Sequence, residues 1–361
     1  MVYIAWMKAE TLLPLGKLDP GLRAPDAGLD LGAVPADAGR VEALGYHALL
    51  MEETKEDPFQ VLALAAAATK RVHLGTSVAI AFARSPYVTA QAAWTLQKLS
   101  GGRFELGLGS QVRGHIQRRF GMPWQAPGPW MRDYVRALKA IWHSWQSGTP
   151  LAFESAHYNL NLNVPLFTPA PIEQPEIPVQ VAAVNPYMAR VAAEAADGVR
   201  LHPVCTPDYI KTVLLPAAAP YRQPEFEVCL KPLIAAAPDE ATLAERAEVV
   251  RARLAFYCST PAYARAFAIY GLEDLCAKMA GLSKRGAWAE MAANIDDDLL
   301  HRFAVVSRYD ALADDILTRY ADCIDRVEVS IPLVEPSDFE ALSAIVERLG
   351  QAAVDGCTQN L

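Results

Sequence analysis

The 361-residue sequence lacks the patterns that mark several easily recognised classes of protein. Its six cysteines are scattered and form no CxxC pair, so we expect reduced thiols in a core rather than a disulfide framework or a zinc finger. Its seven histidines include no HxH and no HExxH, which disfavours a metal-dependent hydrolase, and we predict no metal site. No apolar run reaches the roughly 18 residues that a membrane span needs.

Two further absences bear on location and partners. The segment Met1–Ala9 has neither the basic start nor the long apolar stretch of a signal peptide, so we expect a cytoplasmic protein. The net charge of −8 disfavours general nucleic-acid binding, which needs a basic face. We therefore expect a small-molecule ligand, with no nucleic acid and no membrane as partner.

The sequence does contain a regular alternation of short apolar runs and helical patterns. Eight runs are continuously apolar or β-branched, which is typical of strands covered on both faces in a parallel sheet. These predicted strands are Val2–Trp6, His47–Met51, Val72–Val78, Phe104–Leu108, Pro178–Ala183, Gly198–Leu201, Phe226–Ile234 and Val327–Ile331.

The junctions after these runs carry helix-start patterns. At four of them a capping residue precedes a proline, which is the N-cap and first helical position of a helix. These pairs are Asp57-Pro58, Ser85-Pro86, Asn185-Pro186 and Thr206-Pro207. Strand, cap and helix units that run to eight favour a (β/α)₈ TIM barrel over an open sheet, and we predict one domain over residues 1–361.

Two segments interrupt the repeating pattern. Ser147–Pro178, after the fourth strand, and Thr260–Asp298, after the seventh, are too long for ordinary connections. We predict that both are insertions at the catalytic face of the barrel and that they shape the substrate pocket. Their aromatic side chains predict a fairly hydrophobic substrate; they include Phe153, Tyr158, Phe167, Tyr263 and Trp288.

Candidate catalytic residues lie at the ends of two predicted strands. Glu52 and Glu53 follow the apolar run HALLM and are acid/base candidates, although they are equally explained as solvated loop charges or helix caps. Since neighbouring side chains of a strand point to opposite faces, we expect only one of them to face the cavity. His202, at the end of the sixth strand, is a third candidate, and a structural histidine is the commoner alternative.

Candidate binding residues follow the fourth and fifth strands. In GLGS, Gly109 and Ser110 allow a planar ligand or phosphate to approach the backbone, although most such glycine pairs are plain turns. A basic stretch with His115, Arg118 and Arg119 could bind an anionic tail or form a solvated helix face. The segment AAVNP places small residues before a capped helix start, which suits a phosphate as well as a packed turn.

Three segments resemble the luciferase-like monooxygenase superfamily, in order and over the first two-thirds of the chain. They are ALGYHALLMEETKEDPF, RVHLGTSVAIAFARSPYVTAQAAWTLQKLSGGRFELGLGSQ and VAAVNPYMARVAAEAADGV. Within that superfamily the chain is most similar to the coenzyme F420-dependent oxidoreductases, in which a segment like ETKxDPF follows the second strand. The resemblance implies a TIM barrel with an insertion, usually a homodimer, that binds F420 or FMN.

The resemblance also assigns expected roles to matching positions. The LGTSV segment, with Thr76, Ser77 and Val78, resembles the bulge that backs the cofactor ring, and implies a cis peptide bond between Ser77 and Val78. The AAVNP segment resembles the turn that holds the cofactor phosphate, which implicates the run Ala183–Asn185. His115 lies where related proteins carry a polar contact beside the ring.

The chain departs from the sugar-phosphate dehydrogenases of this superfamily. They have an Asp-His pair where this chain has Glu52-Glu53, and a glutamate base where this chain has Val112. We therefore expect an F420-dependent oxidoreductase that acts on another substrate, with Glu53 or Glu52 as the proton source and His202 next. Of the two glutamates we choose Glu53 to face the cavity, because it matches the histidine of that pair. The alternatives are an FMN-dependent monooxygenase and a barrel that binds a flavin without catalysis.

Overall fold

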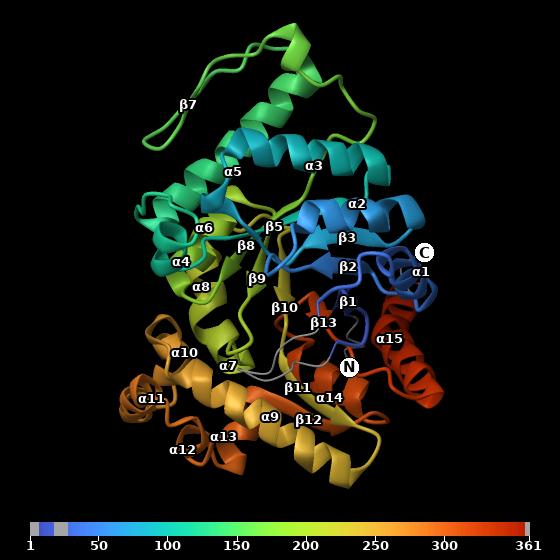
Figure 1. The fold of residues 1–361 in the computed structure, drawn as a ribbon, viewed down its shortest axis with the longest axis vertical. Coiled ribbons are helices and arrows are strands. Elements are labelled where there is room, and N and C mark those ends of the chain that lie inside the picture. The colour runs from blue at the N-terminus through green and yellow to red at the C-terminus, as the bar shows by residue number, and fades with distance from the viewer. Residues whose placement is uncertain (1–6, 18–27, 358–361) are drawn as a thin grey trace.

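The computed structural model describes residues 7–17 and 28–357, and its centre is a closed barrel of eight parallel strands. The strands follow the order β3-β2-β1-β13-β10-β9-β8-β5, and β5 pairs with β3 to close the barrel. Figure 1 shows this barrel with helices packed around it. The barrel strands are β1 (Lys8–Leu12), β2 (Ala48–Met51), β3 (His73–Thr76), β5 (Phe104–Gly109), β8 (Val179–Ala183), β9 (Gly198–Leu201), β10 (Glu227–Leu230) and β13 (Arg326–Glu328).

The predicted (β/α)₈ TIM barrel is confirmed, with two differences in its strands. The predicted first strand, Val2–Trp6, lies outside the described residues, and the first barrel strand is β1. The predicted run Phe226–Ile234 is divided between β10 and β11 (Leu233–Ala237), because Pro232 has no N–H group with which to continue the ladder. Strand β11 leaves the barrel and pairs in parallel with β12 (Ala304–Arg308).

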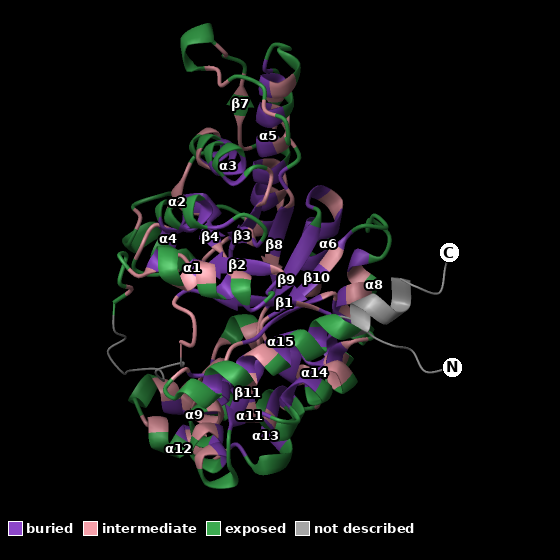
Figure 2. Cartoon of the chain, turned by 90° about the vertical axis from the view of Figure 1, so that its right-hand side faces the viewer, coloured by how far each residue is buried: buried purple, intermediate pink, exposed green. Residues whose placement is uncertain are grey.

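Helices cover the outside of the barrel, with their exposed faces outward and the buried strands inside (Figure 2). All four predicted caps are confirmed, because each side chain accepts a hydrogen bond from a backbone N–H in the first turn of its helix. The covering helices are α1 (Val34–Ala43), α2 (Pro58–Ala68), α3 (Pro86–Ser100), α5 (Pro127–Ser147), α6 (Pro186–Ala195), α7 (Pro207–Tyr209), α8 (Leu215–Ala218), α14 (Leu312–Tyr320) and α15 (Pro336–Cys357).

The segment Ser147–Pro178 lies between the fourth and fifth barrel strands, as predicted, but it follows α5 instead of the strand itself. It contains the short hairpin β6 (Phe153–Glu154) and β7 (Asn159–Leu160), which extends beside α5 and α3 (Figure 1). Tyr158 accepts a hydrogen bond from the Trp130 indole of α5, and the Trp94 indole of α3 donates to a carbonyl of the segment. The segment connects α5 to β8, and none of its residues lines the cavity described below, so its predicted role in the substrate pocket is not supported.

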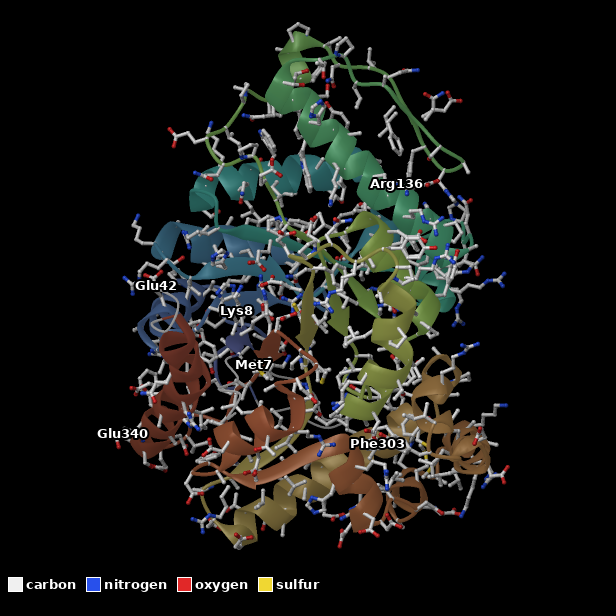
Figure 3. The ribbon with its side chains drawn as sticks, turned by 180° about the vertical axis from the view of Figure 1, so that it is seen from behind. Met7, Lys8, Glu42, Arg136, Phe303 and Glu340 are labelled. Carbon is white, nitrogen blue, oxygen red and sulfur yellow. The ribbon has the colours of Figure 1, made fainter. Side chains whose placement is uncertain are left out.

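The second interruption does lie between the seventh and eighth barrel strands. It begins with β11 and α9 (Glu240–Cys258), continues through α10 (Ala264–Ala268), α11 (Glu273–Arg285), α12 (Trp288–Ala292) and α13 (Asp297–Phe303), and ends with β12. Phe303, labelled in Figure 3, stacks on Phe267 with ring centroids 4.6 Å apart, so these helices share an apolar core. Among the described residues, no helix has both the length and the apolar character needed to cross a bilayer.

The inside of the barrel holds charged residues that meet at its centre. Arg200 of β9 donates to both carboxylate oxygens of Glu10 from β1, at 3.0 and 3.1 Å. Arg326 of β13 contacts Glu10, Glu105 and Glu227, and its N–O distances to Glu10 and Glu105 are 3.0 and 2.6 Å. Because Glu10, Glu105, Arg200 and Arg326 are all buried, these pairs replace the solvation that each charge loses on folding.

Candidate active site

A cavity of 740 Å³ opens above this charged layer, at the carboxyl ends of the barrel strands. Its walls come from the ends of β1, β2, β3, β8, β9, β10 and β13, and its outer side comes from β11 and α9. The volume lies in the range of small-molecule and cofactor sites. In barrel enzymes the catalytic residues stand at this face, so the cavity is the candidate active site.

Two carboxylates and an ammonium group form a cluster in the cavity wall. Lys231, which follows β10, lies 2.9 Å from Glu52 Oε1 and 3.0 Å from Glu328 Oε1. Burial tends to raise the pKa of Glu52, but Lys231 outweighs it and the pKa lies below its usual value. Burial and repulsion by Glu52 raise the pKa of Glu328 in spite of Lys231. The cluster therefore holds a proton more readily on Glu328 than on Glu52.

The second oxygen of Glu328 is the exceptional atom of this cluster. Glu328 is 7% exposed and lines the cavity, and its Oε2 atom has no hydrogen-bond partner among the described residues. A buried oxygen without a partner is costly unless a ligand supplies one. Oε2 is thus the atom of this cluster that a bound molecule could supply with a partner, after a small rotation of the side chain.

Glu53 does not reach the cavity, and our choice of Glu53 over Glu52 as the carboxylate facing it is wrong. Its carboxylate accepts a hydrogen bond from the Ile80 amide at 2.7 Å and pairs with Arg84 at 2.6 Å. Arg84 also pairs with Asp57. Alternation along the strand does separate the two glutamates, as expected, but it turns Glu52 inward and leaves Glu53 to hold the segment after β3.

His202 lines the cavity as predicted, packed between two aromatic rings. Its ring centroid lies 4.0 Å from that of Tyr263 and 4.7 Å from that of Tyr257. Burial lowers the pKa of His202 to about 3, and Lys231 adds to the shift. The imidazole is therefore neutral near pH 7 and is a poor proton donor.

The segment after β3 brings its backbone to the cavity. Ser77 and Val78 line it, and the peptide bond between them is cis, as the resemblance implied. Thr76 lies behind them and donates a hydrogen bond to the Gly107 carbonyl at 2.6 Å. A Cβ on Gly107 would lie 1.9 Å from the Thr76 oxygen, and one on Gly109 would lie 2.6 Å from a Val78 methyl. These glycines therefore serve close strand packing, and Gly109 is not part of the cavity wall.

Ala183 and Val184 line the cavity just before α6 begins. Asn185 is the N-cap of this helix and accepts a hydrogen bond from the Met188 amide at 2.9 Å, so its side chain serves the helix instead of the cavity. The start of α6, with its amide groups and its positive dipole end, therefore meets the cavity through the residues that we predicted for a phosphate.

The basic stretch after β5 lies on the surface. It forms α4 (Arg113–Arg118), on which the His115 and Arg118 side chains are exposed, and Arg119 donates to the Thr54 carbonyl at 2.9 Å. Neither these residues nor Ser110 lines the cavity. A role for His115 beside a bound ring has no support from this arrangement.

The aromatic residues predicted for the substrate pocket also lie outside the cavity wall, and that expectation is wrong. The wall from the second interruption comes from β11 and α9, upstream of Thr260.

The sequence analysis missed two residues of the site, Lys231 and Glu328. Both are charged residues within predicted apolar strands. A charge in such a strand was the one sign in the sequence that these residues take part in a site, since a charge inside a buried strand needs a partner.

Comparisons with known proteins place this geometry in a family. The model of the luciferase-like monooxygenase family matches residues 17–326. An uncharacterised protein of Mycobacterium tuberculosis is 38% identical over 329 residues, which cover 88% of this chain and 96% of that protein.

Three solved structures share the fold. The coenzyme F420-dependent tetrahydromethanopterin reductase of Methanopyrus kandleri has a TM-score of 0.70 and 19% identity, over 95% of this chain and 98% of that one. An F420-dependent secondary alcohol dehydrogenase bound to an F420-acetone adduct has a TM-score of 0.70 and 15% identity, over 95% of this chain and 99% of that one. The oxygenating component of 3,6-diketocamphane monooxygenase of Pseudomonas putida, with FMN, has a TM-score of 0.64 and 15% identity, over 96% of this chain and 98% of that one. With a match that spans most of the chain and a cavity at the catalytic face of a (β/α)₈ barrel, this chain belongs to the luciferase-like monooxygenase family.

Proposed function

We propose that the chain is an F420-dependent oxidoreductase that reduces the carbonyl group of a fairly hydrophobic compound, or oxidises the corresponding alcohol. The observation that carries this proposal is the cluster of Glu52, Lys231 and Glu328 in the cavity wall, in which burial and Glu52 raise the pKa of Glu328. Carbonyl reduction needs one hydride and one proton, and Glu328 is placed to hold the proton. The two F420-dependent neighbours in the same fold support the choice of cofactor.

The cavity walls suit a deazaflavin. Apolar side chains such as Val78, Leu201 and Val329 offer flat surface for a ring, and the start of α6 offers amide groups for a phosphate. When bound, the deazaflavin would supply or accept the hydride. The cavity wall made by β11 and α9 would exclude water from the reacting carbon, which strengthens every polar contact inside.

The residues of the chain would divide the remaining work. Glu328 Oε2 would donate the proton to the carbonyl oxygen, and Lys231 would hold the resulting carboxylate through Oε1. Glu52 would keep Lys231 in position and keep the pKa of Glu328 high. In alcohol oxidation the same oxygen would accept the proton instead.

The main alternative is an FMN-dependent monooxygenase, because an FMN-bound enzyme has the same fold. Titration of cofactor-free protein with F420 and with FMN, followed by fluorescence, tests the two. We expect F420 to bind at least tenfold more tightly than FMN, and reduced F420 to be oxidised by ketones without oxygen consumption. Tighter binding of FMN, with oxygen consumed, would assign the chain to the monooxygenases.

The exposed arginines of α4 give a second test of the cofactor. F420 carries a polyglutamyl tail in addition to the phosphate that it shares with FMN, and exposed cations attract such a tail over about 8–10 Å. Reversing the charges of Arg118 and Arg119 to glutamate should weaken F420 binding by about 10-fold at low salt and leave FMN binding unchanged. The matched control reverses Arg308, which is exposed on β12. If the double variant binds F420 as tightly as the wild type, this helix has no part in binding.

A further inference from the structure

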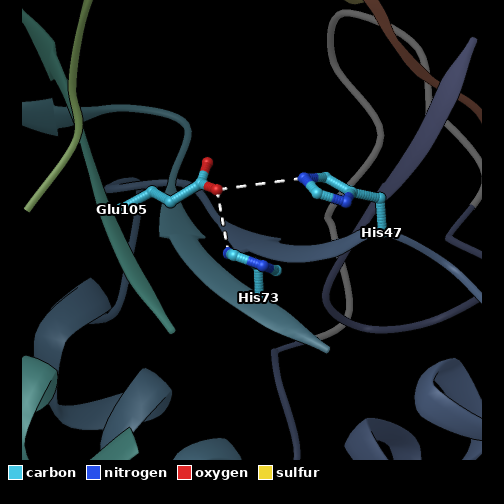
Figure 4. A group of neighbouring side chains, drawn as sticks. All are labelled: His47, His73 and Glu105. Carbon is cyan, nitrogen blue, oxygen red and sulfur yellow. Dashed lines mark ion pairs between the residues drawn. The ribbon is translucent and has the colours of Figure 1, made fainter. Parts of the chain in front are cut away.

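Three possible metal ligands meet at the opposite face of the barrel, where the strands begin. His47 directly precedes β2, His73 is the first residue of β3, and Glu105 is the second residue of β5. Figure 4 shows both imidazole rings directed at the carboxylate. Among the described residues these three form the one group of histidine, cysteine and acidic side chains whose ligand atoms all lie within 4.8 Å of one another.

The distances between these atoms are close to those of a coordination site. His73 Nδ1 lies 3.1 Å from Glu105 Oε1, and His47 Nε2 lies 3.9 Å from the same oxygen. Two ligands at about 2.0–2.1 Å from a tetrahedral metal lie about 3.3 Å apart, so small side-chain rotations would complete the geometry. Both imidazole nitrogens are buried and have no hydrogen-bond partner of suitable geometry among the described residues. Such atoms are costly to bury unless something binds them.

The surroundings orient the carboxylate and leave a way in. The other oxygen of Glu105, Oε2, accepts a hydrogen bond from Arg326 at 2.6 Å, and partners of this kind typically fix a metal-binding carboxylate. The positive charge of Arg326 is balanced by Glu10 and Glu227, so a cation beside Oε1 does not meet an unpaired arginine. Glu105 is 2% exposed, whereas the His73 side chain is 39% exposed, so an ion can enter from solvent past His73.

We propose that His47, His73 and Glu105 bind one Zn²⁺ ion that links the beginnings of β2, β3 and β5. Two imidazoles and one carboxylate suit zinc better than magnesium or calcium, which prefer oxygen ligands. Water from the open side would complete the tetrahedron. The amino-terminal face of a barrel serves stability, so the ion has a structural role that is separate from the cavity and independent of the proposed reaction.

The test is a titration of chelator-treated, tag-free protein with ZnCl₂, followed by calorimetry and by thermal unfolding. We expect one equivalent to bind and the melting temperature to rise with zinc concentration, because zinc would bind the folded state. Co²⁺ as a spectroscopic probe should give the visible absorption of a tetrahedral site with nitrogen and oxygen ligands. His47→Gln and His73→Gln should each lose at least 90% of the affinity, while the matched control His143→Gln, which is exposed on α5, should bind as the wild type does.

Two outcomes would overturn the proposal. One is a wild-type protein that binds no stoichiometric zinc, and the other is full zinc affinity in the His47 and His73 variants. If either variant fails to fold, modification of wild-type histidines by diethylpyrocarbonate, read by mass spectrometry, decides the matter. Zinc should then protect His47 and His73 and leave His143 reactive; equal modification with and without zinc would contradict the site.

Discussion

Replacing Glu328 by glutamine is expected to lower the turnover of ketone reduction by about 10²- to 10⁴-fold and to leave cofactor affinity nearly unchanged. Glutamine keeps the shape of the side chain and its contact with Lys231, but it has no carboxyl proton to release. The assay follows oxidation of reduced F420 with the ketone that turns over fastest in a panel of aliphatic and aromatic ketones. Binding of oxidised F420 in the same preparations reports cofactor affinity.

Glu52→Gln is the matched control, because Glu52 contacts the same lysine from the other side. It should slow turnover less, since Glu52 contributes position and charge but no proton. Infrared spectra give a reading that needs no substrate: the carbonyl band of a protonated buried carboxyl should be present in the wild type and in the Glu52 variant, and absent in the Glu328 variant. Equal turnover in both variants, or an unchanged band, would exclude Glu328 as the proton source.

The pH dependence of turnover follows from the direction of the Glu328 shift. Reduction needs the protonated form, so turnover should fall as pH rises through the raised pKa of Glu328. Glu52→Gln removes a negative neighbour that favours the proton, so the decline should move to lower pH. Glu328→Gln should lose this decline. A wild-type profile that rises with pH in the reductive direction would contradict the assignment.

The barrel could be predicted from sequence because its evidence is local. Apolar runs and capped helix starts depend on residues a few positions apart, and all four predicted N-caps, such as Asp57 and Thr206, accept the expected hydrogen bonds. The position of the Ser147–Pro178 segment could not be predicted in the same way. It depends on which end of the barrel the chain has reached. To know that, one must first recognise α5 as the helix that follows the fourth barrel strand.

The candidate site was predicted only in part, because contact between strands is not local. Alternation correctly separated Glu52 from Glu53, but it does not state which side faces inward, and the contacts with Ile80 and Arg84 decide that. Lys231 and Glu328 are nearly one hundred residues apart, and only barrel closure brings them together with Glu52. A charge inside a predicted apolar strand was the one available indication, and the same pattern marks Glu105 and Arg200.

Arg326 is the residue whose loss should destabilise the fold most among the charged pairs described above. It is 3% exposed and contacts three carboxylates from three other strands, β1, β5 and β10. In the described part of the chain, Arg200 donates hydrogen bonds to Glu10 and to neither Glu105 nor Glu227. Without Arg326, Glu105 would keep its contacts with His73 and the Gln180 amide but would lose its arginine partner, and it would have to accept a proton or draw water into the barrel.

Arg326→Met is therefore expected to lower the free energy of unfolding by about 3–5 kcal/mol, which is the usual cost of removing one partner from a buried ion pair. Methionine fills much of the same volume, so the loss would come from charge more than from a cavity. Urea denaturation in the presence of EDTA measures the change without any contribution from bound metal.

The control is Arg308→Met, which removes an exposed pair with Asp310 and should cost at most about 1 kcal/mol. Arg326→Lys keeps the charge but cannot reach three carboxylates at once, so its stability should fall between the wild type and Arg326→Met. A loss in Arg326→Met no larger than that in Arg308→Met would mean that the carboxylates in the barrel are already neutral or hydrated, and that the charged layer does not hold the strands together.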